Sequence, residues 1–218
     1  MATVAIVDLG IGNLRSVEKA VERASEDASL AWQAVITSDP ERVAGADKVI
    51  VPGQGAFRDC AVALQGGLAS AIRSQIERGV PFLGICLGLQ SLFETSEEAE
   101  GHRGLAMFRG TNVRLAGGLV DPENGQPVKI PHMGWNRIEV AGEVHPYLAA
   151  AGGPGTYFYF THSYHAVPED SSLLAATAQH GPLRVTAAIA RGNVFASQFH
   201  PEKSQAAGLL LLTAFLKR

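Results

Sequence analysis

Cys86 is a cysteine flanked at short range by glycines, in the stretch Gly84-Ile85-Cys86-Leu87-Gly88. Apolar residues precede it and helix-like sequence follows it, so we expect it at a strand-to-helix junction. G-x-C-x-G at such a junction is the nucleophile-elbow pattern with cysteine in place of serine. A thiol at a helix N-terminus ionises more readily, and the thiolate is the reactive form. The pattern predicts a cysteine nucleophile, although a small core cysteine at the end of a strand also fits it.

A cysteine nucleophile needs a general base, and that base needs an acceptor to orient it. The stretch F-H-P-E places His200 and Glu202 two residues apart at the end of a strand-like run. Residues two apart on a strand share a face, and Pro201 between them stiffens the segment. An isolated histidine is more often an ordinary surface or core residue. Together with the elbow cysteine, however, this pair favours a base and its orienting carboxylate.

The stretch Pro52-Gly53-Gln54-Gly55 lies between a strand-like run and a helical one. Its glycines allow positive φ and close approach of the backbone to a ligand. Backbone N–H groups of such a loop, together with that of Leu87, are candidates for an oxyanion hole. A tight turn with only a structural role is the alternative.

The first half of the chain predicts alternating strands and helices that would position these residues. Apolar runs at 3–9, 34–37, 48–53 and 81–86 predict strands, and 13–24 and 68–79 have helical spacing, with Gly79 ending the second helix. Continuous apolar strands joined by helices indicate a parallel sheet covered on both faces.

The second half predicts mostly strands, separated by Gly, Asn and Pro turns. These runs lie at 111–116, 127–140, 155–167, 172–178, 184–192 and 193–202, and A-R-G-N-V is typical of a hairpin. Residues 204–218 predict a closing helix with Ser204 as its N-cap. We therefore expect an α/β fold with an additional mixed β layer, in a single domain spanning 1–218.

Composition excludes several classes of protein. The chain has 218 residues, a net charge near −3 and no basic stripe, which argues against nucleic-acid binding. Two cysteines without C-x-x-C spacing argue against a disulfide framework and a zinc ribbon. No signal peptide or bilayer-length apolar run is evident, so we expect a cytoplasmic protein without a membrane partner.

Two further patterns carry little weight. In G-I-G-N-L-R the third glycine position of a dinucleotide fingerprint is Arg15, so we expect no such cofactor. His162 and His165 have H-x-x-H spacing, but no cysteine or carboxylate cluster supports a metal site, and we expect none. Cys60 lacks distinctive neighbours and is expected to be structural.

Three blocks, G-I-C-L-G-L-Q, P-G-Q-G-A-F and F-H-P-E, resemble those of class I (triad-type) glutamine amidotransferases. D-L-G-I-G-N-L-R-S-V, F-E-T-S-E-E, K-I-P-H-M-G-W-N and F-T-H-S-Y-H are similar to the glutaminase subunits (HisH type) of imidazole glycerol phosphate synthase. The blocks span nearly the whole chain in the same order. The resemblance implies a flavodoxin-like fold with a central, mostly parallel sheet.

The resemblance also implies roles for individual residues. Cys86 would attack the glutamine side-chain amide, His200 would transfer the proton and Glu202 would orient the imidazole, with a γ-glutamyl thioester as the intermediate. The N–H groups of Leu87 and Gln54 would bind the oxyanion. Substrate contacts would come from Gly55, Gln90, Glu98, His162 and Ser163. Glu98 can accept the substrate ammonium, although Glu97 and Glu100 are rivals.

Finally, the resemblance implies a heterodimer with a (β/α)8-barrel synthase subunit (HisF type). That partner would use the ammonia to form imidazole glycerol phosphate and AICAR in histidine biosynthesis. Asn13, Trp135 and Lys203 lie in blocks that the family uses at this interface, although Trp135 also fits a core strand. The family more often has Val where this chain has Gln54. Another class I glutaminase or a free-standing γ-glutamyl hydrolase is the alternative.

Overall fold

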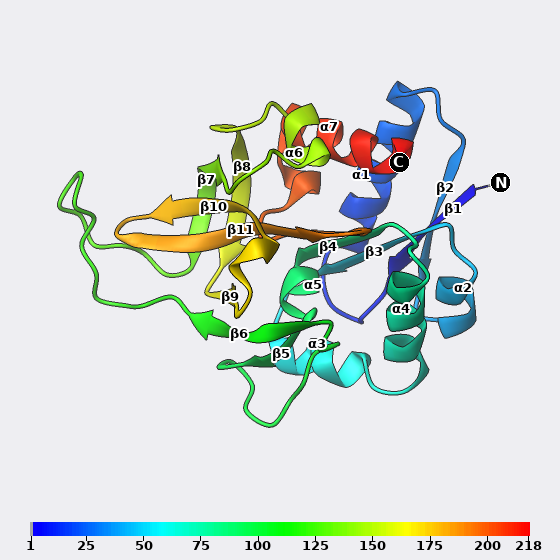
Figure 1. The fold of residues 1–218 in the computed structure, drawn as a ribbon, viewed down its shortest axis with the longest axis horizontal. Helices are drawn as coiled ribbons and strands as arrows, with labels where there is room; N and C mark the ends of the chain where they lie inside the picture. The colour runs from blue at the N-terminus through cyan, green and yellow to red at the C-terminus, as the bar shows by residue number, and fades with distance from the viewer. Residues whose placement is uncertain (1) are drawn as a thin grey trace.

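The central feature is a nine-stranded sheet with the order β2-β1-β3-β4-β12-β11-β10-β7-β8 (Figure 1). The computed structural model describes residues 2–218. The first five strands are parallel and comprise β1 (Ala2–Val7), β2 (Trp32–Thr37), β3 (Lys48–Gly53), β4 (Phe82–Cys86) and β12 (Val194–Ser197). This order matches the flavodoxin-like arrangement, in which ligands bind beyond the carboxyl ends of the strands.

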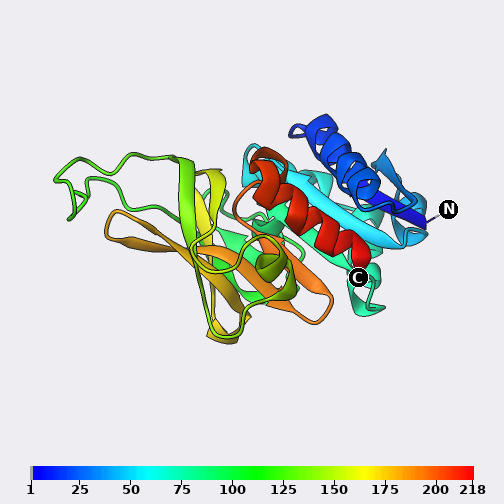
Figure 2. The ribbon, with the colours of Figure 1, turned by 90° about the horizontal axis from the view of Figure 1, so that it is seen from above.

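Every residue of β3, β4 and β12 is buried, as the apolar runs of a sheet covered on both faces predict. One face packs against α1 (Leu14–Asp27), α6 (Pro146–Ala150) and α7 (Gln205–Lys217). The other packs against α2 (Pro40–Ala44), α3 (Phe57–Ala63) and α4 (Gly67–Glu77). Figure 2 shows α1 and α7 side by side over the parallel strands. The predicted α/β architecture is confirmed.

Four antiparallel strands of the second half continue the central sheet, and the additional mixed β layer that we expected is confirmed as a second, smaller sheet. The four strands are β11 (Leu183–Arg191), β10 (Leu174–His180), β7 (His132–Val140) and β8 (Tyr157–His162). A smaller three-stranded sheet has the order β5-β6-β9 and contains β5 (Phe93–Ser96), β6 (Phe108–Arg114) and β9 (Tyr164–Pro168). The predicted hairpin is confirmed, since β11 and β12 pair antiparallel with Arg191 opposite Val194.

Two expectations about individual elements were wrong. The run 127–140 is strand only from His132 onward. The run 155–167 breaks at Ser163 into β8 and β9, which belong to different sheets. Ser204 is the N-cap residue of α7, as predicted, but its hydroxyl makes no capping hydrogen bond, because it donates to the His200 carbonyl at 2.6 Å and accepts from the Tyr159 N–H at 3.0 Å.

The remaining elements are short. The four-residue helix α5 (Leu87–Gln90) follows β4 directly, and the 3-10 turns η1 (Ser171–Leu173) and η2 (Pro201–Lys203) precede β10 and α7. No helix among residues 2–218 is both long and apolar enough to cross a membrane.

Candidate functional site

Cys86 lies at a strained turn between β4 and α5, with φ 54° and ψ −104°. A non-glycine residue at positive φ is uncommon and often marks a functional site. The flanking glycines are required by packing. A Cβ on Gly88 would lie 1.7 Å from the Val51 carbonyl oxygen, and one on Gly84 would lie 2.8 Å from the Gly88 oxygen. The turn therefore packs α5 closely against β3 and β4 and reverses the chain direction sharply at Cys86.

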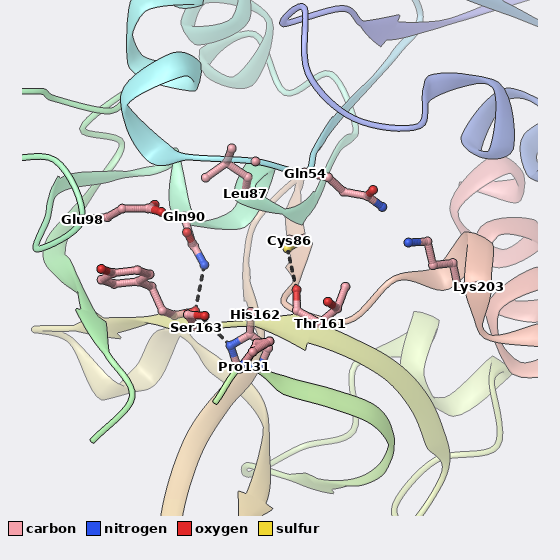
Figure 3. A pocket seen from close by; sticks show the side chains of 12 residues that line it. Gln54, Cys86, Leu87, Gln90, Glu98, Pro131, Thr161, His162, Ser163 and Lys203 are labelled. Atoms are coloured by element: carbon pink, nitrogen blue, oxygen red, sulfur yellow. Dashed lines mark hydrogen bonds between the residues drawn. The ribbon is translucent and has the colours of Figure 1, made fainter. Parts of the chain in front are cut away.

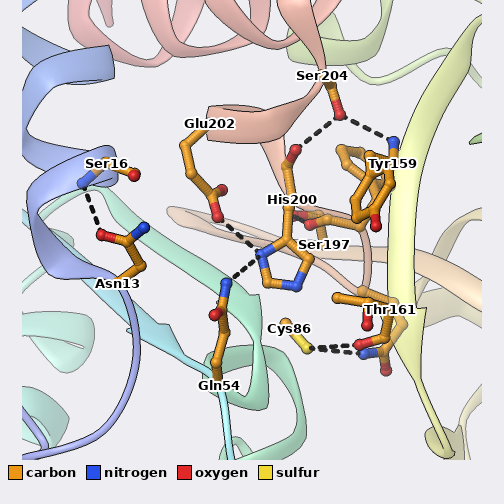
Figure 4. A network of polar contacts seen from close by, with 12 residues as sticks. Asn13, Ser16, Gln54, Cys86, Tyr159, Thr161, Ser197, His200, Glu202 and Ser204 are labelled. Carbon is orange, nitrogen blue, oxygen red and sulfur yellow. Dashed lines mark hydrogen bonds and ion pairs between the residues drawn. The ribbon is translucent and has the colours of Figure 1, made fainter. Parts of the chain in front are cut away.

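His200 and Glu202 form a buried pair beside this turn (Figure 4). The His200 Nδ1 donates to Glu202 Oε1 at 2.8 Å, and the two side chains are 1% and 2% exposed. The imidazole lies between the carboxylate and Cys86, as Figure 4 shows. Its Nε2 is buried and makes no hydrogen bond to residues 2–218. Hydrogen bonds of catalytic groups are often long before substrate binds and tighten afterwards.

The surroundings favour the charged form of His200. Burial lowers the pKa of this imidazole, but the Cys86 sulfur and the Glu202 carboxylate outweigh that effect and raise the pKa to about 10. The arrangement can therefore hold a thiolate and an imidazolium together. Cys60, in contrast, is buried in α3, where desolvation raises the pKa of its thiol to about 12. Only Cys86 is placed to react.

A pocket of about 350 Å³ opens beside the Cys86 sulfur (Figure 3). Eight of its lining residues were predicted from the sequence as catalytic, oxyanion or substrate-binding residues: Gln54, Gly55, Cys86, Leu87, Gln90, Glu98, His162 and Ser163. Lys203, which was predicted at the partner interface, also lines the pocket. Pro131, Thr161 and Tyr164 also line it and were not predicted. The sequence blocks thus converge on one cavity.

The three acidic candidates differ in their placement. Glu98 lines the pocket, and its Oε2 accepts from the Phe57 N–H at the start of α3 at 2.8 Å. Glu97 instead accepts from the Arg114 N–H at 2.8 Å, and Glu100 is exposed. Glu98 therefore faces the cavity with one carboxylate oxygen already engaged and the other free.

Gln54 follows the end of β3 and Leu87 follows the end of β4. Both residues therefore flank the sulfur, since Gly53 and Cys86 are paired in register. Leu87 is the first residue of α5, so its N–H has no acceptor within the helix. The side-chain nitrogen of Gln54 lies 3.4 Å from His200 Nδ1. Because Nδ1 already donates to Glu202, this contact adds no second hydrogen bond from the imidazole.

His162 belongs to a buried chain of imidazoles that the sequence did not predict. Its Nδ1 lies 2.9 Å from the Tyr164 carbonyl, so it must donate there, and its Nε2 accepts from His132 Nδ1 at 2.9 Å. Asn136 then donates to His132 Nε2 at 3.1 Å. Burial lowers the pKa of His132 to about 3 and that of His162 well below its usual value. Both rings are therefore neutral, and they fix the backbone that lines the pocket.

Gln198 is a second residue that the sequence did not single out. It is fully buried and lies 3.4 Å, through its amide, from the Cys86 sulfur. The signal was present, because Gln198 precedes His200 by two positions in a strand-like run. Within residues 2–218, His, Cys, Asp and Glu side chains do not gather into a group of three that could bind a metal.

The three predicted interface residues lie outside the core. Asn13 is exposed and accepts from the Ser16 N–H at 3.2 Å at the start of α1. Trp135 is 46% exposed on β7, so it is not a core residue of this chain. Lys203 lies over the Tyr159 ring, with Nζ 5.9 Å from the ring centroid, and Tyr159 in turn contacts Trp135.

Comparisons with known proteins agree with this geometry. Residues 5–217 match the family model described as glutamine amidotransferase class-I. The chain is 46% identical over 217 residues to the imidazole glycerol phosphate synthase subunit HisH of Methylococcus capsulatus, covering 100% of this chain and 97% of that protein. It is 47% identical over 213 residues to the subunit of the same name from Syntrophotalea carbinolica, covering 97% and 98%.

Solved structures share the fold. A structure described as a glutamine amidotransferase superposes with a TM-score of 0.70 at 19% identity, over 97% of this chain and 98% of that one. The PurLQS structure from Thermotoga maritima superposes with a TM-score of 0.70 at 20% identity, over 99% and 98%. At these identities the match is evidence for the fold alone.

Proposed function

The chain belongs to the class I glutamine amidotransferase family, and from that premise we propose that it is the glutaminase subunit of an imidazole glycerol phosphate synthase. Relatives of that name are 46% and 47% identical to it over almost their full length. The observation that carries the proposal is the placement of Cys86 at a strained elbow, facing the buried His200–Glu202 pair.

In the proposed reaction the Cys86 thiolate attacks the side-chain carbonyl of glutamine. The imidazolium of His200 passes its proton to the leaving nitrogen, which departs as ammonia and leaves a γ-glutamyl thioester. Water, deprotonated by the now neutral imidazole, hydrolyses the thioester to glutamate and restores the thiol. Glu202 holds the imidazole in the required tautomer throughout, because it accepts from Nδ1. The N–H groups of Leu87 and Gln54 are the proposed oxyanion donors.

The pocket offers complementary groups to the rest of the substrate. The free carboxylate oxygen of Glu98 suits the α-ammonium as a charge-assisted acceptor. Gln90 has both amide protons engaged, with Tyr164 O at 2.9 Å and Gln198 Oε1 at 3.1 Å. Gln90 therefore presents its oxygen as an acceptor. Backbone groups of Gly55 and of the His162–Ser163 segment complete the proposed glutamine site.

We propose that a (β/α)8-barrel synthase subunit covers the face that carries Asn13, Trp135 and Lys203. Met133, Trp135 and Tyr157 on β7 and β8 are 62%, 46% and 56% exposed. Large exposed apolar side chains that cluster are typical of an interaction surface. Lys203 lies at both the pocket and this face, so ammonia formed at Cys86 would leave toward the partner.

We also propose a domain organisation and a cellular location for the protein. All 218 residues would form one glutamine amidotransferase domain, which is supported by a central sheet that takes strands from both halves of the chain. The protein would act in the cytoplasm, where reducing conditions keep a catalytic thiol free.

The test is to purify the chain with a barrel-type synthase subunit and measure glutamate release with and without the nucleotide substrate. We expect low turnover alone, strong stimulation in the complex with nucleotide, and complete loss in Cys86→Ala. High turnover without a partner would instead indicate a free-standing γ-glutamyl hydrolase. A glutamine-analogue electrophile that labels Cys86→Ala as well as the native protein would exclude Cys86 as the nucleophile.

A further inference from the structure

The side chain of Gln198 connects the nucleophile to the substrate-binding amide. It is fully buried just after β12, and its N–H donates to the Ala187 carbonyl at 2.8 Å. Its two amide heavy atoms have one partner each: Nε2 lies 3.4 Å from Cys86 Sγ and Oε1 lies 3.1 Å from Gln90 Nε2. Within residues 2–218, the other hydrogen-bond partner of the sulfur is the Thr161 carbonyl, at 4.0 Å.

The neighbours fix the orientation of both amides. A backbone carbonyl only accepts, so the Gln90 atom that lies 2.9 Å from Tyr164 O must be its nitrogen. The same nitrogen faces Gln198, whose facing atom must therefore be the oxygen. The Gln198 nitrogen is then left to point at Cys86. Turning either amide over would place two donors or two acceptors against each other in a buried site.

We propose that Gln198 is a catalytic residue, which donates a hydrogen bond to the Cys86 thiolate and at the same time holds Gln90 with its oxygen toward the substrate. The inference rests on the proposed glutaminase function and deepens it. A buried amide donor favours an acceptor that carries negative charge, so it stabilises the thiolate over the thiol. Because one side chain serves both neighbours, the nucleophile and the glutamine site are positioned together.

The other charged and titratable groups around the sulfur come from several elements. His200 faces it directly from the end of β12, and Glu202 lies behind that imidazole. Glu98, His162 and Lys203 line the same pocket. All five remain in place when Gln198 is substituted. A change in the ionisation of Cys86 on a neutral substitution of Gln198 would therefore report on the loss of the amide donor.

Two substitutions separate the two contacts of Gln198. Gln198→Met removes both contacts at similar volume. Gln198→Glu keeps an acceptor for Gln90 but removes the amide donor to the sulfur. Gln75→Met is the matched control, because Gln75 is 1% exposed and its amide donates to the Val43 and Ala46 carbonyls, on the face of the sheet that carries α2 and α4.

The first readout is the pH dependence of Cys86 alkylation by iodoacetamide in the chain alone. Burial suppresses ionisation of Cys60, so the signal reports on Cys86. We expect the midpoint to rise by about one pH unit in Gln198→Met, the size of a lost hydrogen bond to a charged group, and by more in Gln198→Glu, which also places a carboxylate beside the sulfur. The second readout is glutamate release by the complex with the barrel subunit. There we expect kcat to fall about tenfold in both variants, and KM for glutamine to rise only in Gln198→Met.

An unchanged alkylation midpoint and an unchanged kcat in either folded variant would overturn the inference, as would equal effects in Gln75→Met. If Gln198→Met does not fold, Gln198→Glu alone decides. Failure of the native complex to release glutamate would count against the proposed function. The alkylation profiles would still show whether Gln198 stabilises the thiolate.

Discussion

Replacing Glu202 by Gln tests how much the buried carboxylate contributes to the site. Its Oε1 accepts from His200 Nδ1 at 2.8 Å, and both side chains are shielded from water, at 1% and 2% exposure. Glutamine keeps an acceptor there but removes the negative charge, which helps raise the pKa of His200 to about 10. A buried hydrogen bond to a charged group is worth about 1.5–3 kcal/mol and a neutral one about 1 kcal/mol. The expected loss in kcat/KM is therefore roughly 2- to 30-fold.

Glu202→Leu should be more severe, because it leaves a buried imidazole nitrogen with no acceptor. Breaking a buried pair in this way costs about 3–5 kcal/mol, or roughly 10²- to 10⁴-fold in rate. The assay is glutamate release by the complex across a pH series. Asp170→Asn is the control, since Asp170 pairs with Arg191 at the surface and such pairs are worth about 0–1 kcal/mol. A Glu202→Gln enzyme with native kcat/KM at every pH would refute the role that we assign to this carboxylate.

Three further predictions follow from the same geometry. Gly88→Ala should be insoluble or lose more than about 3 kcal/mol in urea unfolding, because its Cβ would lie 1.7 Å from the Val51 oxygen. Folding raises the pKa of His200 from 6.5 to about 10, so the charged imidazole contributes its full stabilisation of the fold below pH 6.5. This contribution to the free energy of unfolding declines as the pH rises toward 10. Urea titrations between pH 6.5 and 10 should show a shallower decline of the free energy of unfolding in Cys86→Ala, because this variant removes one cause of the raised pKa of His200. His132→Phe should raise KM for glutamine severalfold, because it removes the donor that fixes the pocket backbone of β8.

For each of these three predictions, a specific result would contradict the reasoning. Gly117→Ala places its Cβ at ordinary contact distance, 4.0 Å from Ile130 Cδ1, and should be near native, so an equal loss there would contradict the packing argument for Gly88. An identical pH dependence in the native protein and Cys86→Ala would show that the sulfur does not raise the pKa of His200. A native KM in folded His132→Phe would show that the imidazole chain is not needed to position the pocket.

The parallel half of the fold was predictable because its signals are local. The runs that became β3 and β4 are continuously apolar, and Gly79 ends α4 at a φ of +81° as the C-terminal signal predicted. The break at Ser163 was not predictable. The strand-like run continues through it without a glycine or proline, and the competition between two sheets separates β8 from β9.

The residues of the candidate site also divide into those that the sequence predicts and those that it does not. Cys86, His200 and Glu202 stand in short patterns whose chemistry can be read from residue type and spacing. Gln198 shares a face with His200, but neither its role nor that of His132 belongs to such a pattern, and their partners lie 112 and 30 residues away in sequence. A buried polar side chain gains its role from the acceptor that the fold places beside it. The pairing of distant strands decides which acceptor that is.

One such pairing fixes the site. β12 pairs in parallel with β4, with Ser197 opposite Ile85, so the residues just beyond both strand ends meet at the sulfur. Phe199 points the other way and stacks on Phe158 with ring centroids 4.0 Å apart. A shift of the β12–β4 register by one residue would bring the Phe199 ring to the sulfur in place of Gln198 and His200.

Phe199→Ala should therefore cost about 3–5 kcal/mol in urea unfolding through the cavity that it leaves. It should also lower kcat under conditions where the variant remains folded, because the ring that holds the register is gone. Phe215→Ala is the matched control, since that ring is equally buried in α7 and lies away from the strand end. Comparable destabilisation with loss of kcat only in Phe199→Ala would support the register argument. Equal loss of kcat in both variants would contradict it, because general loosening of the core would then explain the effect.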